Sequence, residues 1–422
     1  HVSMSLDAEW IDSSEACSIL GVKRATLYAY VSRHRIRTTE SSDGRRRRYH
    51  RSDITRIKKR GDARRGHGAV AAGALRWGEP VLDTAIGGIE PTGHHYRGIP
   101  VLELLAKQET FESILERLWS PDTGDVLPGM VAAPPWIHAP PPDLETPVDA
   151  MRYALLHAEK EERRRYPSPA ALRETHHRLV RYLVAAVGWY QITSSQNNNE
   201  AAGRRAERSL AAFSVARGLL LALDRKPHRI EANAVDTALV TMADHGLNAS
   251  TFAARVAASA GASSAASLSA ALATFSGSQH GAAVHRIASL LHDVDERGAA
   301  QVVGDRVRRG EDLPGFGHPA YPAGDPRFTW LWKAAEAASD GSAILKIMRD
   351  LVAAMRLVGG PPPNADLGLL AVAGLLENDP RRAAEVAQIL FAVGRSAGWL
   401  AHVAEQRAAG FLLRPRAQYR PR

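Results

Sequence analysis

Histidines, an aspartate and arginines lie in short glycine- and proline-containing segments of this sequence. The most distinctive segment is 311–327, EDLPGFGHPAYPAGDPR, which contains His318 and Arg327. Gly315 and Gly317 bracket an aromatic residue, and prolines stand on both sides, so the segment cannot form the middle of a helix. We therefore predict a loop of fixed shape, the kind of segment that commonly positions functional side chains on a rigid scaffold.

Other segments supply groups of the same chemical types. They contain His245, His280, Asp366, Arg395 and Arg414. Imidazoles donate hydrogen bonds and transfer protons near neutral pH, and a carboxylate accepts a proton. Arginine binds carboxylates through two parallel hydrogen bonds, a geometry that lysine cannot copy. The set therefore combines acid–base groups with binding groups for anions.

These segments, in this order, resemble the motifs of the citrate synthase family. The resemblance runs from about Trp77 to the C-terminus. Its six motifs are MADHGLNASTFAAR (242–255), SGSQHGAA (276–283), PGFGHPAYPAGDPR (314–327), PPNADLGLLA (362–371), FAVGRSAGWLAH (391–402) and LLRPRAQY (412–419). Six motifs in register make coincidence improbable.

The resemblance implies a mainly α-helical body in two parts around a cleft. A large domain would comprise 75–284 and 376–422, and a small domain 285–375. The sequence agrees, because the chain from 148 onward is dense in Ala, Leu and Arg with little strand character. We expect the few strands of the body within 75–97. Site residues divided between the two parts imply that domain closure assembles the site and excludes water.

The family's reaction condenses a thioester methyl carbon with a 2-oxo acid and then hydrolyses the thioester. By resemblance, Asp366 takes the methyl proton, His280 donates to the thioester oxygen, and His318 polarises the keto oxygen of the second substrate. The resemblance assigns oxo-acid binding to His245, Arg327, Arg395 and Arg414. It implies oxaloacetate and acetyl-CoA or propionyl-CoA as substrates, citrate or 2-methylcitrate and free CoA as products, and no separate cofactor. In the family the equivalent of Arg414 reaches across a dimer interface, which implies a homodimer.

Each of these residues also has a structural interpretation. His245 would be a hydrogen-bonded core histidine, His280 a helix cap, Asp366 the N-cap of a helix over 367–376, and Arg414 a tail charge. The sequence also departs from the family at Ala282, where glycine is usual, at Gly246, where glutamate is common, and at Ala365, where valine is usual. We expect these changes to affect rate or substrate fit more than reaction class.

The first 66 residues contain 16 Lys+Arg and 8 Asp+Glu, and so carry +8 of the chain's net charge of +9. Asp12 and Glu15 predict a helix start, Gly21 a turn, and 23–32 a second helix. Strands over 36–39 and 46–50 would flank a turn at 41–44. This layout, within 4–60, resembles the winged helix-turn-helix of MerR-like regulators and excisionases. Lys23, Arg24 and Thr26 are candidate groove contacts, and Arg45, Arg46, Arg47 and Arg48 candidate phosphate contacts in a wing.

The partner of this basic module is left open between duplex DNA and protein, and a solvated basic tail is a further alternative. Residues 61–74, rich in Gly, Arg and Ala, predict a linker. A second hypothesis for the whole chain follows, in which a transcriptional regulator uses the synthase fold to bind an effector. Asp366, His280 and His318 favour the enzyme, because an effector site needs the arginines but has no use for a base.

Other classes of function lack their sequence signals. The uncharged run 256–275 is rich in serine and alanine and poor in large apolar residues, so we expect no membrane span. A phosphate-binding GxxxxGK[ST] motif is absent. The neighbouring pairs His94-His95 and His176-His177 do not predict a metal site, because adjacent residues on a helix point apart. The single cysteine, Cys17, and the lack of a visible signal peptide favour the cytoplasm.

Overall fold

The computed structural model describes residues 10–32, 36–40, 47–51, 53–55, 82–119, 130–141, 143–162, 169–190, 199–339, 341–415 and 419. The chain divides into two compact units. The first comprises His1–Asp83 with Pro415–Arg422, and the second is the body, Thr84–Arg414.

Over its described residues, the first unit contains a three-stranded antiparallel sheet, two short helices and a helical segment at 53–55. Its strands are β1 (Trp10–Ile11), β2 (Thr38–Glu40) and β3 (Arg47–His50), in the order β1-β3-β2, and its helices are α1 (Ser13–Leu20) and α2 (Arg24–Ser32). Both predicted helices and both predicted strands are confirmed. The two-residue strand β1 was not predicted, because it is too short to show an alternating pattern.

Local sequence explains the boundaries of α1. The side chain of Asp12 accepts hydrogen bonds from the backbone N–H groups of Ser14 at 2.7 Å and Glu15 at 2.8 Å, so Asp12 is the N-cap as predicted. Gly21, with φ of 63°, ends the helix in the left-handed conformation that suits glycine. The small core of this unit comprises Ile11, Ala16, Leu20, Leu27, Ile36, Tyr49 and Ile54.

The body begins with a second three-stranded antiparallel sheet. Its strands are β4 (Gly87–Glu90), β5 (Gly93–Tyr96) and β6 (Ile99–Pro100), in the order β4-β5-β6. Gly87 pairs with Tyr96 and Ile89 with His94. The prediction that strands of the body lie near 75–97 is thus confirmed for β4 and β5.

The rest of the body is helical, in agreement with the predicted fold class. Its first helices are α5 (Val101–Ala106), α6 (Phe111–Trp119), η1 (Pro135–His138), α7 (Pro147–Glu162), α8 (Pro169–Val187), α9 (Asn199–Leu210), α10 (Val215–Ala222) and α11 (Arg229–Met242). They are followed by α12 (Ala249–Ser259), α13 (Ser264–Phe275), η2 (Gly281–Ala283), α14 (Val284–Arg297), α15 (Ala299–Arg309), α16 (Pro326–Ala338), α17 (Ala343–Leu357), α18 (Ala365–Leu376) and α19 (Pro380–Ala409).

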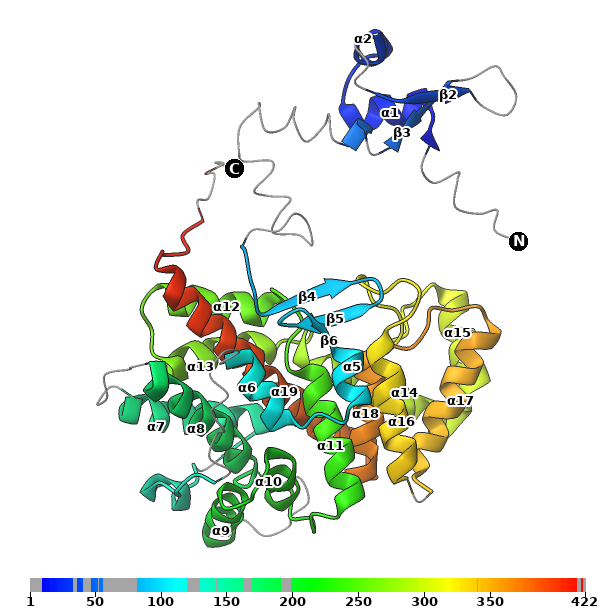
Figure 1. Cartoon of the computed structure of the whole chain (residues 1–422). Helices are drawn as coiled ribbons and strands as arrows, with labels where there is room; N and C mark the ends of the chain where they lie inside the picture. The colour runs from blue at the N-terminus through cyan, green and yellow to red at the C-terminus, as the bar shows by residue number, and fades with distance from the viewer. Residues whose placement is uncertain are drawn as a thin grey trace. The chain divides into compact units, whose positions relative to one another are not determined.

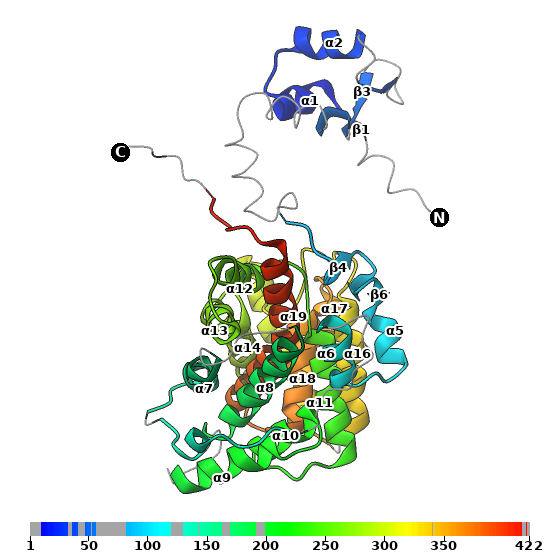
Figure 2. The same cartoon turned by 60° about the vertical axis from the view of Figure 1, so that its left-hand side comes forward.

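The long helix α19 forms the centre of the body. Asp379 caps its start, with Pro380 at the first helical position, and Gly410 ends it with φ of 72°. Most of its side chains between 383 and 403 are buried. It packs against α11, α12, α13, α14 and α18, and both views of the chain show it passing among these helices (Figures 1 and 2). Such a position lets α19 contribute Arg395 to the interior of the body.

Helices α14–α18 pack mainly on one another, with α15 against α17 and α16 against α18. They cover most of 285–375, and α18 and α14 join them to α19. The exact boundaries of a large and a small domain, and a cleft between them, stay predictions. The uncharged run 256–275 covers the end of α12, the turn at 260–263 and all of α13, and the two helices pack against each other. Over the described residues, no helix is both long and apolar enough to cross a membrane.

Candidate active site

Two of the sequence motifs form one structural unit around the loop that carries His318. The backbone N–H of Gly317 donates to the carbonyl of Pro362 at 2.8 Å, and the N–H of Asn364 donates to the carbonyl of Gly315 at 2.9 Å. Gly315 and Gly317 have φ values of 90° and 74°, which only glycine adopts readily. The loop is thereby fixed to the segment that leads into α18 and Asp366.

The surroundings of His318 define its tautomer. Its Nδ1 atom accepts a hydrogen bond from the backbone N–H of Ala320 at 3.1 Å. Burial, together with the charge of Arg327, lowers the pKa of His318 to about 4, so the ring is neutral at pH 7. A neutral imidazole that accepts at Nδ1 carries its proton at Nε2. His318 is therefore a hydrogen-bond donor through Nε2.

His245 lies in the loop after α11, beside His318. Its Nε2 atom is 2.8 Å from the hydroxyl oxygen of Tyr321, and its ring meets the ring of His318 edge-on at 5.4 Å between centroids. Burial and then Arg327 hold the pKa of His245 well below its usual value. Tyr321 was missed by the sequence analysis, although it lies three residues after His318 in the same motif.

Arg327 and Arg395 place two buried guanidinium groups near these histidines. Arg327 makes two hydrogen bonds with the Asp325 carboxylate, at 2.9 and 2.7 Å, and lies over the Tyr321 ring. Arg395, on α19, donates from Nε to the carbonyl of Met242 at 2.7 Å. Burial lowers the pKa of Arg395 to about 10, so it keeps its charge at neutral pH. Both side chains are suited to bind an anion.

Asp366 is the second residue of α18, and its carboxyl has an altered acidity. The N-cap of this helix is Asn364, whose side chain accepts from the N–H groups of Asp366 at 3.1 Å and Leu367 at 3.4 Å. The alternative of Asp366 as N-cap is therefore wrong. Burial, with Asp325 adding to it, raises the pKa of Asp366 even though Arg327 and Arg395 act in the opposite direction. A raised pKa suits a general base.

His280 lies in an aromatic setting. Its Nε2 atom is 2.7 Å from Ser250 Oγ, which also accepts from the indole N–H of Trp399 at 3.1 Å. Its ring packs edge-on against Phe275 and Phe391. Burial, and then Arg395, lowers the pKa of His280 to about 4. The side chain of His280 makes no capping hydrogen bond to the short helix that follows it, so the cap interpretation is wrong.

Of the departures from the family pattern, Ala282 is accommodated in the structure and Gly246 has a local explanation. A Cβ atom at Gly281 would lie 2.2 Å from the Phe275 ring, so glycine is required there, whereas Ala282 is accommodated in the structure. Gly246 has φ of 64°, a conformation strained for glutamate. The loop after His245 thus uses glycine for its turn.

Arg414 is the one predicted body residue that the described contacts do not connect to the others. It is exposed at the end of the body, after the C-terminus of α19. The remaining six residues, His245, His280, His318, Arg327, Asp366 and Arg395, are joined by ring contacts or by the charge effects described above. Within the described residues, no cluster of three or more His, Cys, Asp or Glu side chains is arranged to hold a metal ion.

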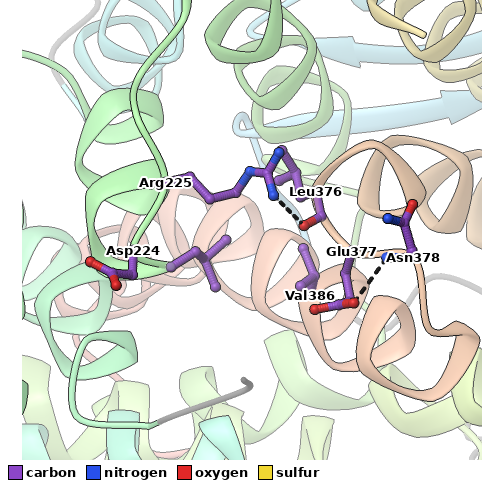
Figure 3. Close-up of a pocket in the computed structure, with 7 residues that line it drawn as sticks. Asp224, Arg225, Leu376, Glu377, Asn378 and Val386 are labelled. Carbon is purple, nitrogen blue, oxygen red and sulfur yellow. Dashed lines mark hydrogen bonds between the residues drawn. The ribbon is translucent and has the colours of Figure 1, made fainter. Parts of the chain in front are cut away.

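A pocket of about 220 Å³ lies elsewhere in the body, where α10 ends and α18 meets α19 (Figure 3). Arg225 extends across it and donates to the carbonyl of Leu376 at 2.9 Å, which caps the end of α18. Arg225 also pairs with Glu231 at 2.9 Å. The pocket contains none of the predicted site residues, and its polar groups hold a helix junction together.

The structure describes part of the basic surface that the sequence predicts in the first unit. Lys23, Arg24 and Thr26 are exposed at the start of α2, and Arg47 is exposed on β3, where Arg48 also lies. Arg45 and Arg46 of the predicted wing, and the predicted linker 61–74, lie outside the described residues. The exposed side chains are compatible with a groove contact by α2.

Comparison with solved structures identifies the class of fold of the body. A citrate synthase from Thermoplasma acidophilum, solved as a ternary complex with carboxymethyl coenzyme A and oxaloacetate, matches 81% of this chain and 94% of that chain with a TM-score of 0.68 and 22% identity. A citrate synthase from Thermotoga maritima matches the same shares with a TM-score of 0.64 and 22% identity. The body therefore has the citrate synthase fold.

Sequence comparison names the family. Residues 74–416 match the family model described as citrate synthase, C-terminal domain, and residues 10–61 match the model described as helix-turn-helix domain. The chain belongs to the citrate synthase family, with a helix-turn-helix domain ahead of the synthase part.

Two curated relatives are a citrate synthase of Haloferax volcanii and a 2-methylcitrate synthase of Mycobacterium tuberculosis. The first is 37% identical over 199 residues, which is 46% of this chain and 52% of the relative. The second is 31% identical over 200 residues, 46% of this chain and 49% of the relative. The chain thus spans about half the length of the curated relatives it matches.

Proposed function

We propose that this chain is a citrate synthase-type acyltransferase. It condenses the acyl group of acetyl-CoA or propionyl-CoA with oxaloacetate and gives citrate or 2-methylcitrate and free CoA, with no cofactor besides the thioester substrate. The observation that carries the proposal is that two buried arginines connect the candidate catalytic groups: Arg327 acts on both Asp366 and His318, and Arg395 acts on both Asp366 and His280. The pKa of Asp366 is raised there, although both arginines lower it. An effector site would need the arginines but not a carboxyl of altered acidity.

In the proposed mechanism, Asp366 removes a proton from the carbon next to the thioester carbonyl. His280 donates a hydrogen bond to the thioester oxygen as negative charge develops there, a contribution of about 3 kcal/mol or more in a site that excludes water. Ser250 Oγ has a single proton and also lies 2.8 Å from Oδ1 of Asn248, which only accepts. The proposal requires the Ser250 hydroxyl to donate to Nε2 of His280 instead, so that the neutral ring carries its proton at Nδ1 and donates it to the thioester oxygen.

The new carbon–carbon bond forms as the enol carbon attacks the keto carbon of oxaloacetate. His318 donates from Nε2 to the keto oxygen and gives up that proton, which yields the hydroxyl group of the product. The proton that Asp366 removed from the methyl carbon is then returned to His318 through water, so both groups are restored. His245, Arg327 and Arg395 hold the carboxylates of the oxo acid in this proposal. Water then cleaves the thioester bond, and CoA leaves as a free thiol.

The test is an assay of free thiol release from acetyl-CoA and from propionyl-CoA, each with oxaloacetate. We expect thiol release that depends on oxaloacetate, and the ratio of the two kcat/KM values gives the acyl preference. Because the two thioesters differ by one methylene, this ratio reports the shape of the acyl pocket. Oxaloacetate binding without any thiol release would favour the effector-binding alternative.

We further propose a cytoplasmic homodimer in which Arg414 completes the partner's oxo-acid site. The exposure of Arg414 at the end of the body leaves it available to a second copy. The single cysteine, Cys17, fits a reducing compartment. The homodimer and the role of Arg414 rest on the family resemblance as well.

A second binding function is supported by the first unit. The exposed Lys23, Arg24 and Thr26 at the start of α2, and the net charge of +8 in the first 66 residues, support binding to duplex DNA. In this proposal α2 enters the major groove and the arginines 45–48 contact phosphates. A regulator that uses the synthase fold only to bind an effector is the corresponding alternative for the whole chain.

A further inference from the structure

The C-terminal end of α11 is capped by side chains from two distant parts of the body. The last carbonyls of a helix have no partner within the helix and must find one elsewhere. Here Tyr96 donates its hydroxyl to the carbonyl of Val240 at 2.8 Å, and Arg395 donates to the carbonyl of Met242 at 2.7 Å. The intervening carbonyl, that of Thr241, lies 3.2 Å from Nε2 of His94.

The proton positions at this end of the helix follow from the partners. His94 Nε2 is also 3.2 Å from the Tyr96 hydroxyl, which donates its proton to the carbonyl of Val240. Since the Thr241 carbonyl and the Tyr96 oxygen can then only accept from this ring, His94 carries its proton at Nε2 and donates it there. Tyr96 has committed its hydroxyl proton to Val240, and its oxygen accepts from the backbone N–H of Asp244 at 3.2 Å. His94 Nδ1 is buried and has no hydrogen-bond partner among the described residues. Burial, with Arg327 adding to it, lowers the pKa of His94 to about 3, which agrees with a neutral ring.

The strands β4 and β5 cover the loop that follows α11 at several points. A Cβ atom at Gly87 would lie 2.3 Å from Oδ2 of Asp244, and one at Gly246 would lie 3.2 Å from the side chain of Ile89. The His94 ring meets the His245 ring edge-on at 5.5 Å between centroids. Residues 244–246 are therefore held between the end of α11 and these strands.

We propose that His94 is a positioning residue for the oxo-acid site. Through its N–H to the Thr241 carbonyl it fixes the end of α11, and through that end it fixes the ring of His245. This inference rests on the proposed function and adds a residue that the family motifs do not contain. Its failure is distinguishable from failure of the proposed function, because one measurement below needs no substrate.

Two substitutions distinguish the contribution of the His94 N–H donor from that of the His94 ring. His94→Gln keeps an N–H donor near the Nε2 position and loses the ring, whereas His94→Phe keeps a ring and loses the donor. The matched control is His177→Phe, because His177 on α8 is also a buried histidine with an unpartnered Nδ1, and the described contacts do not connect it to the site residues. All three variants are expected to melt at lower temperature than the unsubstituted protein.

The enzymatic measurement is KM for oxaloacetate, with KM for the thioester as internal reference. His94→Phe should raise KM for oxaloacetate about tenfold, since it leaves the Thr241 carbonyl without its donor, a loss on the order of one hydrogen bond. KM for the thioester should change less than about twofold. His94→Gln should stay within about threefold of the unsubstituted protein. Equal KM values in His94→Phe and His177→Phe, or a His94→Gln variant as impaired as His94→Phe, would overturn the proposal.

The measurement that needs no substrate is the imidazole 15N spectrum of His245, assigned by its loss in His245→Gln. We expect the His245 signals to move in His94→Phe and to stay in place in His177→Phe. Unmoved signals in His94→Phe contradict a positioning role even if the protein proves inactive. Moved signals in a protein that releases no thiol would sustain the positioning role and reject the proposed function alone.

Discussion

Asp325 accepts two hydrogen bonds from the guanidinium of Arg327, and the same carboxylate accepts the backbone N–H of Ala365 at 2.9 Å. Ala365 precedes Asp366, so a single carboxylate joins the proposed oxo-acid clamp to the start of the helix that carries the proposed base. Burial raises the pKa of Asp325, but Arg327 outweighs this and holds it below its usual value. Asp325 is therefore ionised, and its charge offsets that of Arg327.

This relationship predicts the effect of Asp325→Asn on the pH profile. The charge of Asp325 helps to raise the pKa of Asp366, and Arg327 lowers it. Removing the charge of Asp325 leaves Arg327 unopposed, so the pKa of Asp366 should fall. A base must be ionised to act, and the acid limb of the kcat profile should then move to lower pH. An acid limb that moves to higher pH would show that this titration does not belong to Asp366.

Asp366→Ala should abolish thiol release while oxaloacetate still binds. The substitution removes the proposed base and leaves Arg327 and Arg395 in place. Proton transfer by a positioned side chain is commonly worth about 100- to 10,000-fold in rate. Thiol release and calorimetric binding of oxaloacetate measure the two properties separately. A variant that keeps about a tenth of the original turnover would show that another group is the base.

The sequence predicted the residues proposed to carry out the chemistry better than the residues that hold them in place. His318 and Asp366 stand out because glycine, proline and asparagine around them exclude a helix interior, and local sequence carries that signal. Tyr321, which contacts His245, and His94, which caps α11, have no local signal, since each acts on a residue more than 70 positions away. Only the folded arrangement brings such pairs together. The cap at Asn364 was misassigned by two residues, because asparagine and aspartate both favour helix starts.

The buried histidines should make the protein less stable as the pH falls. Burial lowers the pKa of His176 to about 3, with Arg407 adding to it, and the value in an unfolded chain is near 6.5. Between these values the unfolded state binds more protons, so the free energy of unfolding falls as the pH falls. The slope is at most about 1.4 kcal/mol per pH unit for each such histidine. Urea unfolding of the body between pH 7 and 5 measures it.

The matched variants for this measurement are His176→Gln and Ser264→Ala. His176 Nε2 lies 3.3 Å from Ser264 Oγ, so Ser264→Ala removes this contact, whereas His176→Gln keeps a polar group near the Nε2 position. Only His176→Gln removes the titrating group, and it should flatten the dependence of unfolding free energy on pH. Ser264→Ala should lower stability at every pH with nearly the original slope. Equal slopes in both variants would show that His176 does not bind a proton on unfolding in this range.

The proposed homodimer predicts complementation between two inactive variants. Arg414→Ala chains lack the residue given to the partner, and Asp366→Ala chains lack the base. If Arg414 acts across the interface, one of the two sites in a mixed dimer receives both original residues. Mixing and exchanging the two variants should then restore part of the thiol release. Activity that stays with monomers at every protein concentration would contradict a shared site.

The basic N-terminal unit predicts DNA binding with a strong dependence on salt. The first 66 residues carry +8 of the net +9, and Lys23, Arg24 and Thr26 are exposed at the start of α2. Each neutralised phosphate should contribute about −0.9 to the slope of log affinity against log salt concentration.

Replacing Arg45, Arg46, Arg47 and Arg48 by alanine should make that slope shallower and weaken binding to all sequences alike, because phosphates carry no sequence information. Arg24→Ala or Thr26→Ala should instead change the preference among sequences. Deletion of residues 1–66 should leave thiol release nearly unchanged, since no proposed catalytic residue lies there. Fluorescence anisotropy with labelled duplexes measures the salt dependence and the sequence preference. A lack of duplex binding even at low salt would assign this unit to a protein partner.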